Sequence, residues 1–257
     1  MKAYVFFITI TLILGISPVL FAANLWYDNF DNNKMDAAYK TPDSKTGKTP
    51  VWVEEGGVMK QTEPVSGDPT YLVLEQSKDL AVCGQLVKIR FDEWTDHDRS
   101  RAGLGFWNDS ATSYQAYATL IHNSLTVGNY QFLNDARAWG AAKLDFNTGG
   151  KGAWFWMKSE INATTKKLSG KVWTGALSAE PKSWMIDVDY TTVGAVRTAT
   201  KAVGLNGGAG TPGGGGNSKI SFDEWYVYDS GGPVIAGPVT AVTPMAKLAT
   251  SWGDIKK

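Results

Sequence analysis

The pattern of apolar and polar positions over residues 154–173 predicts a β-hairpin. In its first half, one alternating set is Ala153, Phe155, Met157 and Ile161, and the other is Trp154, Trp156, Lys158 and Glu160. This period of two is expected for a strand that is covered on one face. After the polar turn 162–165, the return run places Leu168, Gly170 and Val172 on one face. A lone hairpin is marginal in water, so we expect a second sheet to cover the apolar face.

The rest of the chain has the same character. Short runs that read as strands occur at residues 25–30, 51–53, 58–61, 71–74, 85–91, 101–107, 114–121, 130–134, 184–189, 203–206 and 219–229. Turn signals separate them, and no helix-period run of useful length lies between them. The sequence therefore predicts an all-β protein, a two-sheet antiparallel sandwich that forms a single domain over residues 24–230.

The two ends of the chain differ from this domain. Residues 1–22 predict a signal peptide, because Lys2 precedes an apolar run at 5–16 that is too short for a first-choice membrane span. Cleavage after Ala22 and cleavage after Ala23 both stay open. No later stretch is long enough to span a membrane, so we expect a mature chain that is secreted or at the cell surface, with the periplasm as a further destination. Residues 231–257 predict a linker and a short C-terminal tail whose role stays open.

Composition narrows the classes of partner. The chain has 25 basic and 25 acidic residues, so its charge gives no attraction for nucleic acid. Its eleven tryptophans suit both core packing and stacking on sugars. Cys83 is the only cysteine and lies in an apolar run, which predicts a small buried residue and no internal disulfide.

Several motifs carry a resemblance to a known family. They are WYDNFDNN near the start, VWVEEGGVMKQ, RAGLGFWND, the hairpin ending GKVW, and ISFDEWYVYD. Together they resemble the concanavalin A-like lectin/glucanase superfamily, and within it the laminin-G-like jelly-roll modules of secreted bacterial proteins. The resemblance covers residues 24–228 and implies a jelly-roll sandwich. It does not select a function, because this superfamily includes lectins, adhesion modules, glucanases and lyases.

The family's glucanases carry a Glu-x-Asp-x-x-Glu strand motif, and this chain departs from it. The nearest run is 185–190, where Met185 takes the place of the first Glu and the last position has no acid. Asp187 and Asp189 would share a strand face, as a strand-end pair commonly does. We therefore predict no catalytic residue, and a divergent glycoside hydrolase of the same fold is the alternative.

The run RAGLGFW predicts a binding face. If Ala102, Leu104 and Phe106 face the core, the intervening set faces out, and its glycines would leave an open floor. The predicted ligand-binding residues are Arg101, Trp107, Tyr117, Arg137 and Trp139. The alternative interpretation is that Trp107 and Trp139 only seal a strand end. The favoured function is an exported, non-catalytic module that binds a polysaccharide or glycan, or another surface partner. A purely structural or adhesive surface protein is the third class.

An acidic loop raises the question of calcium. Asp28, Asp31, Asn32 and Asp36 are close in sequence, and calcium prefers carboxylate and carbonyl oxygens. In many related sandwiches a structural calcium ties the first strand to the last, which here contains Asp223. The resemblance thus implies Asp31 and Asp223 as calcium ligands. The loop lacks EF-hand spacing, and turn formation by Asp and Asn explains it equally well.

Overall fold

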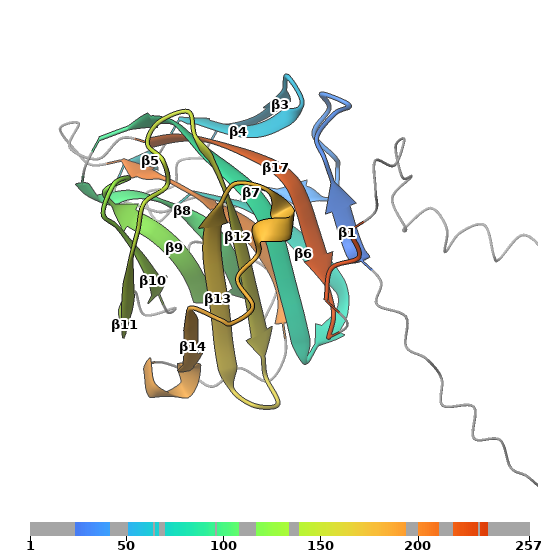
Figure 1. Cartoon of the computed structure of the whole chain (residues 1–257). Coiled ribbons are helices and arrows are strands. Elements are labelled where there is room, and N and C mark those ends of the chain that lie inside the picture. Colours follow the sequence, from blue (N-terminus) through green and yellow to red (C-terminus); the bar gives the residue numbers. More distant parts are fainter. Residues whose placement is uncertain are drawn as a thin grey trace, which may run out of the picture.

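The computed structural model describes residues 24–41, 51–63, 65–66, 70–95, 97–107, 117–133, 139–193, 200–210, 218–230 and 232–235. Two antiparallel sheets pack face to face, which confirms the predicted all-β sandwich (Figure 1). The predicted signal peptide, the end of the linker and the tail lie outside the described residues.

Sheet A has the strand order β14-β13-β12-β7-β17-β4-β3, and β1 pairs with β17 beside this path. Its strands are β1 (Asn24–Asp28), β3 (Val51–Glu55), β4 (Val58–Glu63), β7 (Val82–Trp94), β12 (Trp154–Asn162), β13 (Lys167–Thr174), β14 (Ile186–Asp189) and β17 (Ser218–Tyr228). The predicted hairpin is therefore β12–β13, and its turn spans residues 163–166, one residue later than the sequence predicted.

Sheet B has the order β11-β10-β9-β8-β15-β6-β2. Its strands are β2 (Tyr39–Lys40), β6 (Thr70–Leu80), β8 (His97–Trp107), β9 (Tyr117–Asn123), β10 (Gly128–Leu133), β11 (Trp139–Phe146) and β15 (Thr200–Gly207). Short elements complete the fold: the parallel pair β5 (Val65–Ser66) and β16 (Ala209–Gly210), and the 3-10 turns η1 (Leu177–Ala179) and η2 (Tyr190–Val193).

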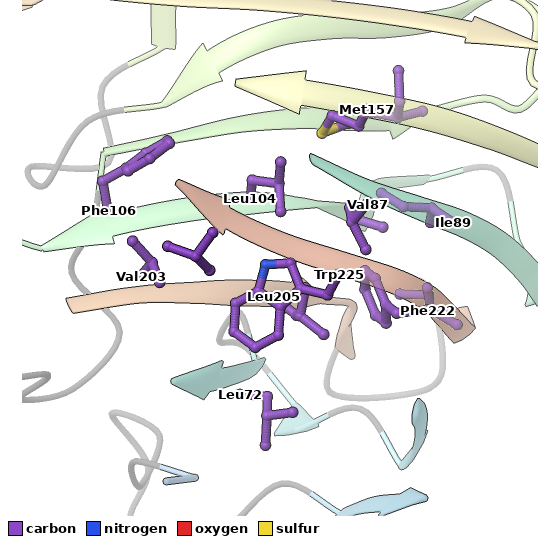
Figure 2. Packing of buried hydrophobic residues seen from close by; sticks show 14 of the residues in the cluster. Leu72, Val87, Ile89, Leu104, Phe106, Met157, Val203, Leu205, Phe222 and Trp225 are labelled. Atoms are coloured by element: carbon purple, nitrogen blue, oxygen red, sulfur yellow. The ribbon is translucent and has the colours of Figure 1, made fainter. Parts of the chain in front are cut away.

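The core lies between the two sheets and follows the predicted alternation. Phe155, Met157 and Ile161 of β12 are buried in it, as are Leu104 and Phe106 of β8. Figure 2 shows how side chains from the two sheets meet, with Leu104, Val203 and Leu205 on one side and Val87, Ile89 and Phe222 on the other. Burial of this apolar surface, at about 25 cal/mol per Å², is the main source of stability.

A chain of polar contacts through Gln85 crosses this core. The Trp225 Nε1 of β17 donates to Gln85 Oε1 at 3.1 Å, and Gln85 Nε2 donates to the backbone oxygen of Gly105 at 2.8 Å. Gln85 belongs to sheet A and Gly105 to sheet B. The bridge thus fixes the position of β8 relative to sheet A.

Two further predictions concern single features. Cys83 is fully buried in the core, as predicted, and burial raises the pKa of its thiol well above the ordinary value.

Strand β11 was not expected from the sequence. Within the described residues, no helix has the length and apolar character that are needed to cross a bilayer.

Candidate functional site

The outward residues of five neighbouring strands in sheet B lie side by side on its outer face, and we call this set the sheet B floor. One transverse row of it places Tyr71 of β6, Asn206 of β15, Gly103 of β8, Leu120 of β9 and Gln131 of β10 in register. Small side chains dominate its centre: Gly105, Ala118, Ala202 and Gly204 are all buried. The floor therefore has few large side chains at its centre.

Asn206 is the most unusual residue of the floor. Its exposed fraction is 0%, and neither Oδ1 nor Nδ2 of its side chain has a hydrogen-bond partner. Val203 and Leu205 on the same strand enter the core, so Asn206 belongs to the opposite, outward set. A buried polar group without a partner costs about 1–3 kcal/mol. Because the side chain is fully buried, other parts of the chain cover this amide, and a ligand group would reach it only after they move aside.

A hydrogen-bonded polar group borders the floor on β8, β9 and β10. Arg101 lies opposite His122, whose Nε2 is 2.9 Å from Gln131 Oε1 and whose Nδ1 is 3.0 Å from Asn123 Oδ1. Gln131 Nε2 in turn donates to the Gly140 oxygen at 2.7 Å. Burial lowers the pKa of His122 from 6.5, and the positive charge of Arg101 adds to this effect. His122 is therefore a neutral, fixed part of the border at neutral pH.

The structure brings some of the predicted ligand-binding residues to this face. Arg101 is half-buried there, and the backbone register puts Trp107 opposite Ala202 and Trp139 opposite Leu133. The side chains of Trp107 and Trp139 and the whole of Arg137 lie outside what the structure describes. The predicted inward face of β8 is confirmed, because Ala102, Leu104 and Phe106 are all in the core.

Two parts of the predicted binding face are wrong. Tyr117 lies opposite Phe106, so it points inward, is fully buried, and packs against Phe132 with ring centroids 5.7 Å apart. Gly103 does not leave an open floor. A Cβ at this position would lie 1.9 Å from the backbone oxygen of Thr119 and 2.9 Å from the Leu120 side chain. The glycine is needed there because β8 and β9 approach closely.

Asn206 was missed by sequence reasoning. In VGLNGG it reads as a turn residue beside two glycines, and only the burial of its amide in the folded chain distinguishes it. The one available signal was its alternation with Val203 and Leu205, which places it on the outward face of β15.

The acidic residues weighed for catalysis have local partners. Ser169 Oγ donates to Asp187 Oδ1 at 2.9 Å, and Asp189 Oδ1 accepts from the backbone and hydroxyl of Thr191. Both belong to β14 in sheet A. On the outer face of sheet B, Glu75 lies on β6 and Asp145 lies on β11, next to the floor, and the strands between them separate the two carboxylates.

The two predicted calcium ligands are engaged by other groups. Asp223 forms an ion pair with Lys88 at 3.6 Å, and Asp31 accepts a hydrogen bond from Asn29. The described part of the chain contains no group of three or more His, Cys, Asp or Glu side chains that could hold a metal. A calcium ion at Asp31 would therefore depend largely on amide and backbone oxygens, and calcium binding stays a prediction.

The outer face of sheet A is different in kind. Trp156 and Trp173 stack with ring centroids 6.2 Å apart, yet only 4% and 5% of their surface is exposed. They form a second small apolar cluster with Leu86, Tyr226 and Tyr228, against which Leu177 packs. Leu177 belongs to residues 175–185, which we call the strap.

The strap is held to the sheet by polar contacts. Glu180 Oε1 accepts from Lys158 Nζ at 2.8 Å and from Lys171 Nζ at 2.7 Å. Lys171 Nζ also donates to the Pro181 oxygen at 2.7 Å, and Trp173 Nε1 donates to the Ala176 oxygen at 3.3 Å. The 3-10 turn η1 of the strap lies in front of sheet A in Figure 1.

Comparison with known proteins identifies the fold. No family model matches the sequence, and no curated protein matches it. The Emp47p carbohydrate recognition domain matches 83% of this chain and 99% of its own, with a TM-score of 0.52 and 11% identity. SCLam, a non-specific endo-β-1,3(4)-glucanase from family GH16, matches 81% of this chain and 91% of its own, with a TM-score of 0.53 and 12% identity.

A sialidase matches 81% of this chain with a TM-score of 0.52 and 7% identity, but this chain spans only 18% of the sialidase. Identities this low establish the fold alone. The chain has the two-sheet jelly-roll fold that the Emp47p carbohydrate recognition domain and SCLam share.

Proposed function

We propose that this chain is an exported, non-catalytic carbohydrate-binding module whose ligand lies on the sheet B floor. The single observation that carries the proposal is the buried and unpartnered amide of Asn206. A side-chain amide offers two donors and an acceptor, so it pairs with neighbouring hydroxyl groups, each of which both donates and accepts. Sugars present such hydroxyls in pairs.

The surroundings of Asn206 support this assignment. The centre of the floor consists of small residues that are all buried, so a flat ring would contact the sheet only if the parts of the chain that cover them move aside. Arg101, on the same strand as Gly103, provides a guanidinium that would bind sugar oxygens or a uronate. Trp107 and Trp139 are predicted to stack on the ligand, since their backbone positions flank the same surface.

Glycoside hydrolysis is the second candidate, because the fold neighbour SCLam is named as a glucanase. The described floor supports glycoside hydrolysis less well than it supports sugar binding. Glu75 is already paired with Lys40 at 2.6 Å, and Asp145 lies on β11 at the opposite edge of the sheet, separated from β6 by the four strands β10, β9, β8 and β15. A retaining pair of carboxylates would have to lie about 5–5.5 Å apart.

The test is a glycan-array screen of the full chain, followed by affinity measurement on Asn206→Ala. We expect Asn206→Ala to weaken binding about tenfold or more, because the amide contacts the ligand. Its melting temperature should not fall, since the substitution removes an unsatisfied buried amide. Asn147→Ala is the matched control, because Asn147 is exposed and its side chain bonds only the Gly149 backbone.

Two results would contradict the proposal. If Asn206→Ala binds the array glycans as tightly as the unchanged chain, the binding site does not lie on the floor. Release of reducing sugar from a glycan that the array identifies would replace the binding module with an enzyme. Trp107→Ala is a second test. If the Trp107 ring stacks on the ligand, its loss should weaken binding by about 1–3 kcal/mol and leave the melting temperature unchanged.

A further inference from the structure

A second set of unpartnered polar groups lies on the opposite side of the molecule, on the outer face of sheet A. Tyr228 of β17 has an exposed fraction of 0%, and its hydroxyl has no hydrogen-bond partner. Buried phenol groups are usually hydrogen-bonded, so this hydroxyl requires an explanation.

The direction of the Tyr228 side chain follows from Gly84. In the sheet order, β7 lies between β17 and β12, and Tyr228 is in register with Gly84 of β7. A Cβ on Gly84 would lie 2.1 Å from Tyr228 Cζ and 2.6 Å from its hydroxyl oxygen. The ring therefore crosses β7 over Gly84, and its hydroxyl is directed toward β12.

The residue that it approaches on β12 is Glu160. Glu160 lies directly opposite Gly84, and it is the strongest charge acting on the Tyr228 hydroxyl. It is half-buried, and among the described contacts its carboxylate takes part in no hydrogen bond or ion pair. Burial raises the pKa of Glu160, and the Lys158 ammonium offsets this only in part.

The neighbouring cations are bonded to the strap. Lys158 Nζ is bonded to Glu180 of the strap at 2.8 Å, and it lies 5.8 Å from the centre of the Tyr228 ring. Lys171 is bonded to Glu180 as well. Glu160 and Tyr228 thus form an acceptor and a donor on adjacent strands with a glycine between them.

We propose that Glu160, Tyr228 and Gly84 form a second binding niche, which takes a pair of adjacent hydroxyl groups of a neutral saccharide. One hydroxyl donates to the Glu160 carboxylate, and the other accepts from the Tyr228 hydroxyl. This niche is independent of the sheet B floor. A module with both sites would bind two glycan segments at once, on opposite faces of the sandwich.

The charges around the niche select a neutral ligand over an ion. Glu160 and Lys158 come from β12, Lys171 from β13, Asp187 from β14 and Glu180 from the strap. Three carboxylates and two ammonium groups leave no strong excess of either sign. Trp184 of the strap is half-buried, and Lys171 Nζ lies 4.8 Å from its ring centre, so an aromatic surface is also available beside the niche.

The test is a titration of the ¹⁵N-labelled full chain with three probes: the methyl glycosides of glucose, mannose and galactose. We expect at least one of them to shift the amide signals of Gly84 and Glu160 in two-dimensional NMR spectra. Glu160→Gln and Tyr228→Phe should each weaken that binding about tenfold, because each removes a hydrogen bond to the ligand. Tyr228→Phe keeps the ring over Gly84, so it tests the niche with the packing intact.

Controls separate this niche from the floor. Asn206→Ala should leave the Gly84 and Glu160 shifts unchanged, whatever it does to binding on sheet B. Glu93→Gln changes an exposed carboxylate of β7 that is paired with Lys219, so it should also have no effect. The proposal is overturned if none of the three glycosides shifts Gly84 and Glu160. It is also overturned if both niche variants bind the glycosides as tightly as the unchanged chain.

Discussion

The outer faces of the two sheets use opposite chemistries. Sheet A carries large aromatic side chains on its outer face, and Trp156 and Trp173 are covered there almost completely. Sheet B carries glycine, alanine and one buried amide at the centre of its outer face. A high tryptophan content therefore does not locate a sugar site in this chain, because the described tryptophans of sheet A mostly serve packing.

Both faces combine paired polar groups with an unpartnered one. On sheet A, Lys158, Lys171 and Glu180 pair with one another and hold the strap in place. The Tyr228 hydroxyl on that face and the Asn206 amide on sheet B are both buried without a partner. The faces therefore differ in the chemistry of the unpartnered group, which is a phenol on sheet A and an amide on sheet B.

The largest expected loss of stability comes from removing a tryptophan on the outer face of sheet A, and it tests whether this face is packed like a second core. Trp156→Ala should destabilise the protein by about 3–5 kcal/mol, as expected for a buried aromatic side chain. Trp154→Ala is the matched control on the same strand. Trp154 is half-buried and contacts cations, with Arg90 Cζ at 4.7 Å from its ring centre, so its loss should cost about 1 kcal/mol. Urea unfolding measures both, and equal losses would contradict the comparison.

The next effect contrasts two glycines, one from each face. Gly103→Ala on sheet B would press a Cβ against the Thr119 backbone oxygen, whereas Gly84→Ala on sheet A would press it against the Tyr228 ring. A strand backbone moves less readily than a side chain, so Gly103→Ala should cost about 3 kcal/mol and Gly84→Ala less. Thermal unfolding of the two variants checks this order. A smaller loss for Gly103→Ala would mean that β8 and β9 separate easily.

The smallest effect is a pair of opposite pH dependences on the outer face of sheet A. Burial raises the pKa of Glu160 above 4.5, so its ionised form destabilises the fold at neutral pH. That cost disappears as the pH falls through the raised folded-state pKa toward 4.5. Glu160→Gln should therefore be more stable than the unchanged chain at neutral pH, with the difference closing under acid conditions.

Glu180 should behave in the opposite way. Burial alone would raise its pKa, but the hydrogen bonds and charges of Lys158 and Lys171 outweigh burial, and the net pKa is lowered below 4.5. Its stabilisation is complete above 4.5 and is lost as the pH falls through the lowered folded-state pKa. Glu180→Gln should thus be less stable at neutral pH and should approach the unchanged chain in acid. Melting curves across this range check both signs, and parallel curves for the two variants would contradict them.

The sequence predicted what depends on local periodicity. The inward sets of β8 and β12 were correct, because alternation alone decides which residues share a face. Tyr117 was wrong, because the face of β9 depends on its register with Phe106, which no local pattern encodes. The strap was not foreseen, since Trp156 and Trp173 look solvent-facing until the segment that directly follows β13 folds back over them. Asn206 and Tyr228 were missed for a related reason: whether a polar atom finds a partner depends on the whole fold.

The pairing of the first and last strands has a mechanical consequence. Strand β1 runs antiparallel to β17, and its first residue, Asn24, lies opposite Tyr228 at the end of β17 (Figure 1). Asn24 also forms two hydrogen bonds with the backbone of Val234. Tension that pulls residues 24 and 234 apart would load these contacts first and would then open the strand pair one bond at a time, as a zipper opens. Strand β17 would stay paired with β7 and β4, so a weak pull would release β1 while the remaining sandwich kept its core.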